Sequence, residues 1–209
     1  MYTLYGTKGS GSSIAEAGLE RCGLEYRLVR ASQWEADSAY GELKKVNPLG
    51  QIPTLVLPDG SVLTESASIL MHLGLEYPES GLLPAATSAR AQSLRGLVFI
   101  AANCYSAISQ IDYPERYTTE ATENAHEAVR QGARRVLHRH WEIFADTFAG
   151  HPFLGGAQPG ALDIMAAIVS KWSGARRHLA AERPEFHALL QRIETHPSLV
   201  PVLRRHFDA

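Results

Sequence analysis

The sequence predicts two domains of different type. An α/β domain with the order β-α-β-α-β-β-α is expected over residues 1–78, and an all-helical domain over residues 89–209. Two observations predict this class. Short strand-like runs alternate with helical patterns in the first part, whereas no later stretch alternates as a strand does. Between them, the prolines, glycine and small residues of "YPESGLLPAATS" (77–88) predict a break, with a linker at 79–88.

The first four elements are short, and each has its own signal. In order they are a strand over 2–6, a helix over 13–22, a strand over 25–29 and a helix over 35–46. The first strand, "YTLYG", is apolar and aromatic, as buried strands are. Gly23 is typical of the residue that follows a helix end. Pro48 ends the second helix, because the residue before a proline disfavours the helical conformation.

"TLVLPDGSVLTES" (54–66) gives the clearest local signal in the chain. Two β-rich runs, Thr54–Leu57 and Ser61–Leu63, flank a turn of proline, aspartate and glycine, so they predict a hairpin. Ser66 is then expected to cap a helix that runs to about Tyr77, with its apolar residues on one face. Helical patterns fill the second domain at about 89–110, 120–148, 161–175, 185–195 and 198–206.

Composition excludes several classes of function. The 20 basic and 22 acidic residues give a net charge of −2, which argues against a general nucleic-acid binder. No segment approaches the roughly 20 apolar residues that cross a bilayer, so no membrane partner is expected. The two cysteines stand far apart, and the first residues do not read as a secretory signal. These features predict a cytoplasmic protein in a reducing compartment.

The histidines do not form a metal-binding pattern. His138 and His140 are two positions apart on a predicted helix, so they point to different sides. "HEAVR", which begins at His126, lacks the second histidine of a zinc protease motif. No metal is therefore expected.

The segment "NPLGQIPT" (47–54) places a proline directly before the best strand. Proline cannot donate to a sheet ladder, so Pro53 belongs at a strand start, an edge or a bulge. From there on, "NPLGQIPTLVLPDGSVLTESASILMHL" resembles the glutathione-binding segment of the glutathione transferases. The resemblance extends over essentially the whole chain and implies a thioredoxin-like first domain, a linker near residue 80 and a helical second domain.

The resemblance implies a binding site for glutathione as co-substrate. The proline that matches Pro53 is cis in this family, which turns the backbone N–H and C=O of Ile52 outward to pair with an extended peptide. Ser66 begins a helix whose positive end suits a peptide carboxylate. Glu65 supplies the charge for an amino group, and Gln51 can reach the other end of a tripeptide. Each of these residues also has an ordinary structural role, so their ordered combination carries the inference.

A glutathione transferase must also favour the thiolate, because a thiol is a poor nucleophile. The family places a Tyr, Ser or Cys at the end of the first strand or the start of the first helix. Here Tyr5 lies in the strand, but the glycines and serines that follow are similar to the serine- and cysteine-using classes. Gly11 falls where a cysteine-using class has its cysteine, so Ser10 or Ser12 is expected to be the donor, with Ser10 slightly favoured. A backbone N–H remains an alternative, as does a purely structural role for the serines.

The second substrate is expected between the Ser10 loop and the end of the first long helix of the second domain. Candidates to line its pocket are Phe99, Asn103, Tyr105 and Tyr113. "GALDIMAA" (160–167) resembles the family's helix-capping element, with Asp163 present but Gly160 in place of the usual hydroxyl residue.

The sequence as a whole predicts a transferase that joins glutathione to small hydrophobic electrophiles. By resemblance the protein is expected to be a homodimer, with the first domain of one subunit on the second domain of the other. One alternative is a glutathione-binding or structural protein without turnover. Another is a glutathione-dependent disulfide reductase, peroxidase or isomerase, which would use the bound thiol alone.

Overall fold

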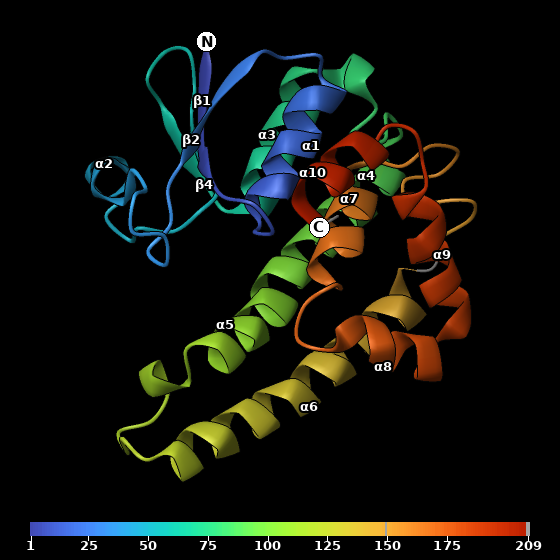
Figure 1. The fold of residues 1–209 in the computed structure, drawn as a ribbon. Coiled ribbons are helices and arrows are strands. Elements are labelled where there is room, and N and C mark those ends of the chain that lie inside the picture. Colours follow the sequence, from blue (N-terminus) through green and yellow to red (C-terminus); the bar gives the residue numbers. More distant parts are fainter. Residues whose placement is uncertain (149, 208–209) are drawn as a thin grey trace.

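The computed structural model describes residues 1–148 and 150–207. Figure 1 shows a sheet-bearing part built from the beginning of the chain beside a larger helical part. The last helix, α10 (Val200–Phe207), returns to pack beside the first, α1 (Ser12–Arg21). Together these features give a thioredoxin-like first domain and a helical second domain, as predicted.

The sheet has four strands in the order β2-β1-β3-β4. Their bounds are β1 Tyr2–Gly6, β2 Tyr26–Arg30, β3 Thr54–Val56 and β4 Val62–Thr64. β1 pairs with β2 in parallel and with β3 in the antiparallel sense, and β3 pairs with β4 as the predicted hairpin. The predicted sequence of strands and helices is confirmed.

The two faces of the sheet carry different helices (Figure 1). α1 and α3 (Ser66–Glu76) cover one face, where Leu4 joins the main hydrophobic core. α2 (Tyr40–Val46) covers the other, where Tyr5 packs in a smaller cluster. Successive residues of a strand point to opposite faces, which explains the split. α2 begins five residues later than predicted.

The late start of α2 has a local cause. Ser38 Oγ donates to the Ser32 carbonyl oxygen (2.6 Å), and Ser32 Oγ donates to Glu35 Oε2 (2.7 Å). Side-chain bonds of this kind compete with helical backbone bonds.

The rest of the chain is helical. The bounds are α4 Thr87–Phe99, a π-helical turn Ile100–Tyr105, α5 Ser106–Asp112, α6 Glu123–Thr147, α7 Ala161–Val169, α8 Ala175–Glu182, α9 Pro184–Glu194 and α10, with 3-10 turns at Pro78–Ser80 and Pro114–Arg116. The helix predicted over 161–175 is shorter than expected, since α7 ends at Val169, and α8 was not predicted. The positive φ of Ser173 (+54°) and Gly174 (+80°) turns the chain before α8, whose N-cap is Gly174.

α7 joins the two parts of the molecule. All nine of its residues are buried, and it packs against α1 and α3 as well as α4 and α9. A helix that is apolar on every side is expected at the centre of a core. The buried apolar residues of both parts accordingly form one continuous cluster.

The start of α7 shows why its cap lacks a hydroxyl residue. Asp163 accepts the N–H groups of Leu154 (2.7 Å), Gly155 (2.8 Å) and Gly160 (2.9 Å). A Cβ at Gly160 would lie 2.8 Å from the Leu82 carbonyl oxygen. That oxygen already accepts a hydrogen bond from the N–H of Ala161. A serine cannot be accommodated there unless the backbone moves, so the half cap follows from the close approach of the two segments.

Candidate functional site

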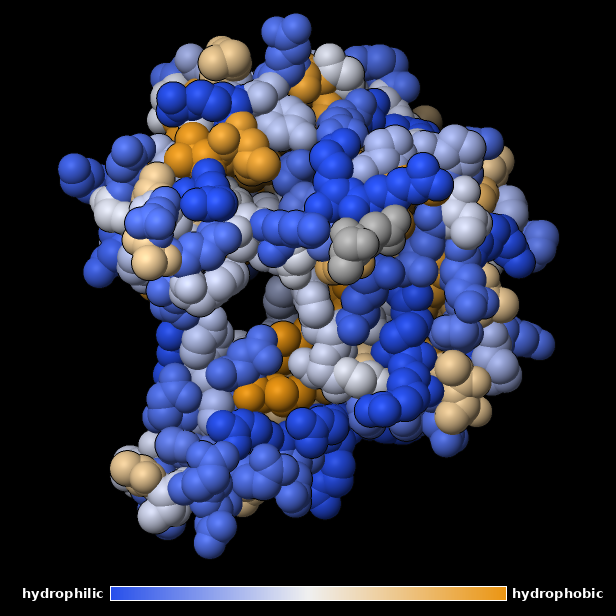
Figure 2. Space-filling model, in the orientation of Figure 1, coloured by the Kyte–Doolittle hydropathy of each residue, from blue (hydrophilic) through white to orange (hydrophobic). Residues whose placement is uncertain are grey.

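A cleft of about 820 Å³ opens between the sheet-bearing part and the helices that follow it. Figure 2 shows the surface hollowed at this place, above α5 and α6. The first wall comes from the loops before α1 and β3 and from the start of α3, and the second comes chiefly from α5 and the π-helical turn. The first wall holds all five residues predicted for glutathione binding: Gln51, Ile52, Pro53, Glu65 and Ser66.

The loop before β3 is organised by Asn47, which is buried. Its Nδ2 donates to the Gln51 carbonyl oxygen (3.1 Å) and to Thr54 Oγ1 (3.0 Å). The Ile52–Pro53 bond is cis, as the resemblance implied. No hydrogen bond within the described parts of the chain uses the backbone N–H or C=O of Ile52. Ile52 therefore offers the cleft a donor and an acceptor, as an unpaired strand edge does.

The chain enters α3 through a sharp turn at Glu65, whose φ is +63°. The prediction that Ser66 caps the helix is wrong, because Glu65 stands at the cap position and Ser66 is the first helical residue. Ser66 Oγ instead donates to the Gly11 carbonyl oxygen (3.4 Å). The first N–H groups of α3 thus meet the cleft at the positive end of the helix dipole, beside the Glu65 carboxylate.

The two candidate serines lie in the loop before α1 and bond within it. Ser10 Oγ lies 2.7 Å from the Thr7 carbonyl oxygen and 2.9 Å from Ser12 Oγ. Ser12 Oγ lies 3.0 Å from the same carbonyl and accepts the Thr7 N–H at 3.2 Å. Ser10 is half-buried and lines the cleft, whereas Ser12 is fully buried and does not. The geometry therefore leaves only Ser10 within reach of a ligand.

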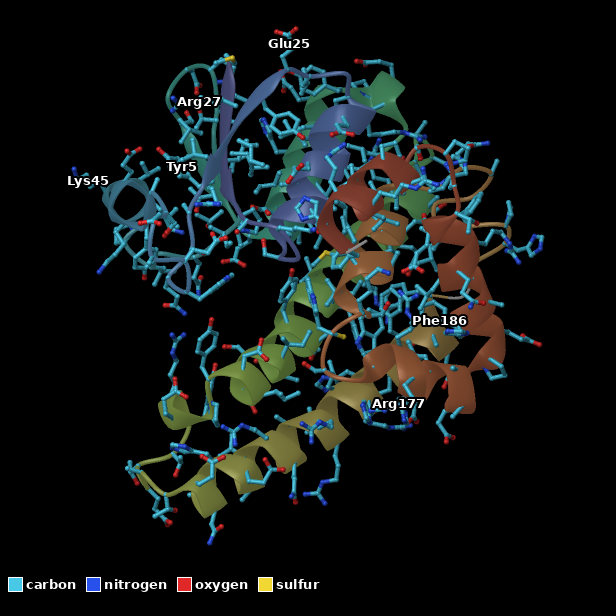
Figure 3. All side chains as sticks on the ribbon, in the orientation of Figure 1. Tyr5, Glu25, Arg27, Lys45, Arg177 and Phe186 are labelled. Atoms are coloured by element: carbon cyan, nitrogen blue, oxygen red, sulfur yellow. The ribbon has the colours of Figure 1, made fainter. Side chains whose placement is uncertain are left out.

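Tyr5, the other N-terminal candidate, faces away from the cleft. Its ring packs against Ala31 and Leu43, on the α2 side of the sheet (Figure 3). Its position keeps its hydroxyl away from the loop before α1.

The last helix holds the loop before α1 from outside. His206 Nδ1 lies 3.2 Å from the Gly9 nitrogen, and His206 Nε2 lies 2.7 Å from Glu16 Oε1. A ring that accepts from Gly9 at Nδ1 carries its proton at Nε2, which then donates to the carboxylate. Burial raises the pKa of Glu16, but hydrogen bonds from His206 and Tyr26 and the charge of Arg205 bring it below the usual value.

The second wall contains two of the four residues predicted for the second substrate. Tyr105 and Tyr113 line the cleft. Phe99 and Asn103 lie outside it, which corrects the expectation for both. Phe99 packs in an aromatic cluster, with ring centroids 5.9 Å from Phe144, and the Asn103 side chain donates to the Phe99 carbonyl oxygen.

Several lining residues of the second wall were missed from the sequence. Half of them are apolar, namely Ala101, Ile108, Met165 and Trp172, and the others are polar or charged, namely Ser106, Ser109, Asp112 and Arg116. They come from the π-helical turn, α5, the 3-10 turn after it, α7 and the segment after α7, and this follows no pattern that a single sequence displays. Tyr113 Oη accepts a hydrogen bond from Gln33 Nε2 (2.9 Å), and the Arg116 guanidinium lies 4.0 Å from the Tyr113 ring centroid. The hydrogen bond between Gln33 and Tyr113 joins the two walls at the mouth of the cleft.

The structure describes residues 1–148 and 150–207. Within these ranges, no three His, Cys, Asp or Glu side chains come together as a set of metal ligands. No helix in the same part of the chain is both long and apolar enough to span a bilayer.

Comparison with known proteins agrees with this architecture. Residues 14–76 match the family model of the glutathione S-transferase N-terminal domain. An uncharacterised GST-like protein of Escherichia coli K12, YncG, is 29% identical over 209 residues, which covers 99% of this chain and 98% of that protein.

Solved structures show the same fold over nearly the whole chain. A glutathione transferase from Methylococcus capsulatus is 28% identical with a TM-score of 0.76, covering 98% of both chains. A glutathione transferase homologue from Sulfitobacter, solved with bound glutathione, has a TM-score of 0.83 at 22% identity, covering 97% of this chain and 96% of that one. The fold is that of the glutathione transferases. Residues 14–76 are thus similar to the glutathione S-transferase N-terminal domain, and the chain as a whole has the fold of that family.

Proposed function

We propose that this protein binds glutathione in the first wall of the cleft and transfers its sulfur to a small hydrophobic electrophile. The observation that carries the proposal is the convergence, in one cleft, of the unpaired Ile52 backbone and the free start of α3. A peptide needs both main-chain partners and a site for its carboxylate, and these two features supply them.

The polar groups of the first wall match the ends of a zwitterionic tripeptide. The N–H groups at Ser66 would bind the γ-glutamyl carboxylate, and Glu65 would pair with the neighbouring amino group. Ile52 would bond to the cysteinyl backbone. Gln51, whose side chain is exposed, would reach toward the glycyl end.

When bound, glutathione supplies a sulfur that loses its proton to solvent, forms a bond to the electrophilic carbon and displaces a leaving group with its electron pair. The protein favours the ionised sulfur through the N-terminus of α1, which follows Gly11. Trp172, Met165 and Ile108 form an apolar surface on the other wall. This surface suits a hydrophobic second substrate.

The test pairs Glu65→Gln with a glutathione analogue that lacks the α-amino group. Calorimetry on the purified protein should give about a ten- to hundredfold loss of glutathione affinity for Glu65→Gln, because a charge-assisted bond is worth about 1.5–3 kcal/mol. Affinity for the analogue should not change. Glu76→Gln, at the exposed end of the same helix, is the matched control.

Turnover is measured beside binding, with an activated aryl halide as electrophile. Conjugation together with binding supports the transferase. Binding without conjugation would favour the glutathione-binding or structural alternative. No binding by the wild-type protein would overturn the proposal.

Two further expectations stay proposals. A homodimer is supported by apolar side chains that both parts leave exposed, Val62 and Leu75 in the first and Val98 in the second, at 42%, 62% and 54% exposure. The cytoplasmic location rests on the sequence alone.

A further inference from the structure

Position 11 lacks a side chain, and another residue fills its place. A Cβ added to Gly11 would lie 2.6 Å from Tyr105 Oη, and 3.4 Å from both Pro53 Cδ and Ser66 Oγ. The backbone there is helical, with φ −60° and ψ −12°, so any residue could adopt it. The Tyr105 hydroxyl, and not backbone strain, therefore makes glycine necessary. The hydroxyl lies within 2.6 Å of the place that the first side-chain atom of a cysteine or serine would take.

The Tyr105 hydroxyl is buried, and it has no hydrogen-bond partner among the described residues. A buried donor without a partner costs about 1–3 kcal/mol, so it calls for an explanation. Burial raises the pKa of Tyr105 above its usual value. The nearby Ser66 hydroxyl opposes this rise, and the negative charge of Glu65 adds to it. The group therefore stays protonated near neutral pH and remains a donor.

The helix that carries Tyr105 is irregular at this point. Ile100–Tyr105 forms a π-helical turn between α4 and α5. Such turns shift the side chains that follow and are frequent at functional sites. The Trp172 ring packs against Tyr105 with centroids 5.8 Å apart and holds it at the cleft wall. Fold and packing thus aim an unpaired donor at the start of α1.

We propose that Tyr105 is the catalytic residue that donates a hydrogen bond to the glutathione sulfur, in place of the side chain missing at position 11. The inference rests on the proposed function and adds the thiol donor to it. The donor comes from the second wall of the cleft, and the N-terminus of α1 stabilises the same sulfur from the first wall.

Ser10 is the competing donor, and its surroundings weaken its case. The Ser10 hydroxyl has two acceptors within its own loop, the Thr7 carbonyl and Ser12 Oγ. A bond from Ser10 to sulfur would require it to give up a hydrogen bond. Within residues 1–148 and 150–207, Tyr105 Oη makes no hydrogen bond of normal geometry, although the Ser66 hydroxyl is near enough to oppose the rise of its pKa.

The test is an ultraviolet titration of bound glutathione, which follows thiolate absorbance between pH 5 and 9, with affinity measured by calorimetry. In the wild type the thiol should ionise below its free pKa of about 8.5. Tyr105→Phe keeps the ring and should raise the pKa of bound glutathione by about one or more, a tenfold loss of thiolate at a given pH. Tyr117→Phe, an exposed tyrosine outside the cleft lining, is the matched control and should change nothing. Ser10→Ala tests the competing donor and should leave the pKa of the bound thiol as it is in the wild type.

Rescue distinguishes a chemical role from a structural one. Gly11→Ser alone should lower glutathione affinity, because its Cβ meets the Tyr105 hydroxyl. In the double variant Gly11→Ser with Tyr105→Phe, the serine has room and should restore most of the lowered thiol pKa.

An unchanged thiol pKa in Tyr105→Phe would overturn the inference, and so would a loss confined to Ser10→Ala. If the wild-type protein binds glutathione but leaves the pKa of its thiol at the free-solution value, the inference fails while the proposed binding site stands. If wild-type protein does not bind glutathione, the proposed function fails first.

Discussion

The two walls of the cleft are built on different principles. The first wall presents main-chain groups, with Ile52 and the start of α3 held in place by Asn47 and by the turn at Glu65. The second presents side chains from helices, with Tyr105 and Trp172 placed by a π-helical turn and by a segment after α7. The comparison teaches that the first wall recognises a peptide through the shape of its own backbone. The side chains of the second wall reach the cleft only if each helix is rotated correctly about its axis.

The largest expected effect is on stability, and it tests whether Phe99 belongs to the core and not to the second wall of the cleft. Phe99→Ala removes a half-buried ring that packs on Phe144, Phe148 and His140. The unfolding free energy should fall by about 2–4 kcal/mol because a cavity remains. Denaturant melts measure this, and KM for the electrophile should stay unchanged. A changed KM with intact stability would return Phe99 to the cleft.

The next effect concerns the joint between the two parts. Gly160→Ser would supply the hydroxyl that the cap of α7 lacks. It should nevertheless lower the unfolding free energy by about 1–3 kcal/mol, because its Cβ would clash with the Leu82 carbonyl oxygen. Gly132→Ala in α6 is the matched control, since an added Cβ there meets nothing within 4 Å. The control should gain about 0.5–1 kcal/mol. A Gly160→Ser variant with a higher melting temperature than the wild type would refute the steric limit that Leu82 sets at position 160.

A smaller effect tests the side-chain share of the first wall. Ser66→Ala should weaken glutathione binding by only about three- to tenfold, because the backbone N–H groups of α3 remain. Ser68→Ala, two residues further along the same helix, should have no effect on calorimetric affinity. If Ser66→Ala abolished binding, the first wall would depend on side chains as much as the second does.

The smallest effect is a pH dependence from the support of the loop before α1. The pKa of Glu16 is lowered in the folded state by His206, Tyr26 and Arg205. Its stabilisation is therefore complete above the unfolded value of about 4.5 and is lost as the pH falls through the lower, folded value.

Melts of wild type and Glu16→Gln between pH 3 and 7 check this dependence. The wild type should lose its advantage over Glu16→Gln below about pH 4.5. Glu25→Gln is the control, since Glu25 points into solvent at the edge of the sheet (Figure 3). A constant difference between wild type and Glu16→Gln over this range would contradict the assignment.

Much of the first part could be predicted from the sequence, because local signals decide it. Pro53, the turn before Ser61 and the helix from Ser66 each have a short-range cause, and all fall where expected. The late start of α2 was not visible, since it depends on bonds among Ser32, Glu35 and Ser38.

The second part could be predicted only as helical. Nothing local marks the π-helical turn that rotates Tyr105 toward Gly11, or the bend at Gly174 that creates α8. Phe99 and Tyr105 look alike as aromatic residues of one helical run, yet one joins the core and the other reaches the cleft. Their difference is set by packing against segments far away in the chain.

The most direct measurement of the central claim is a titration of isotope-labelled protein with glutathione, followed by the shifts of its backbone amide signals. If the first wall binds the peptide through its main chain, the largest shifts should fall at Ile52, Ser66 and Gly11. Leu75, exposed near the end of α3, should not move. Shifts concentrated elsewhere, or none at saturating glutathione, would contradict the account.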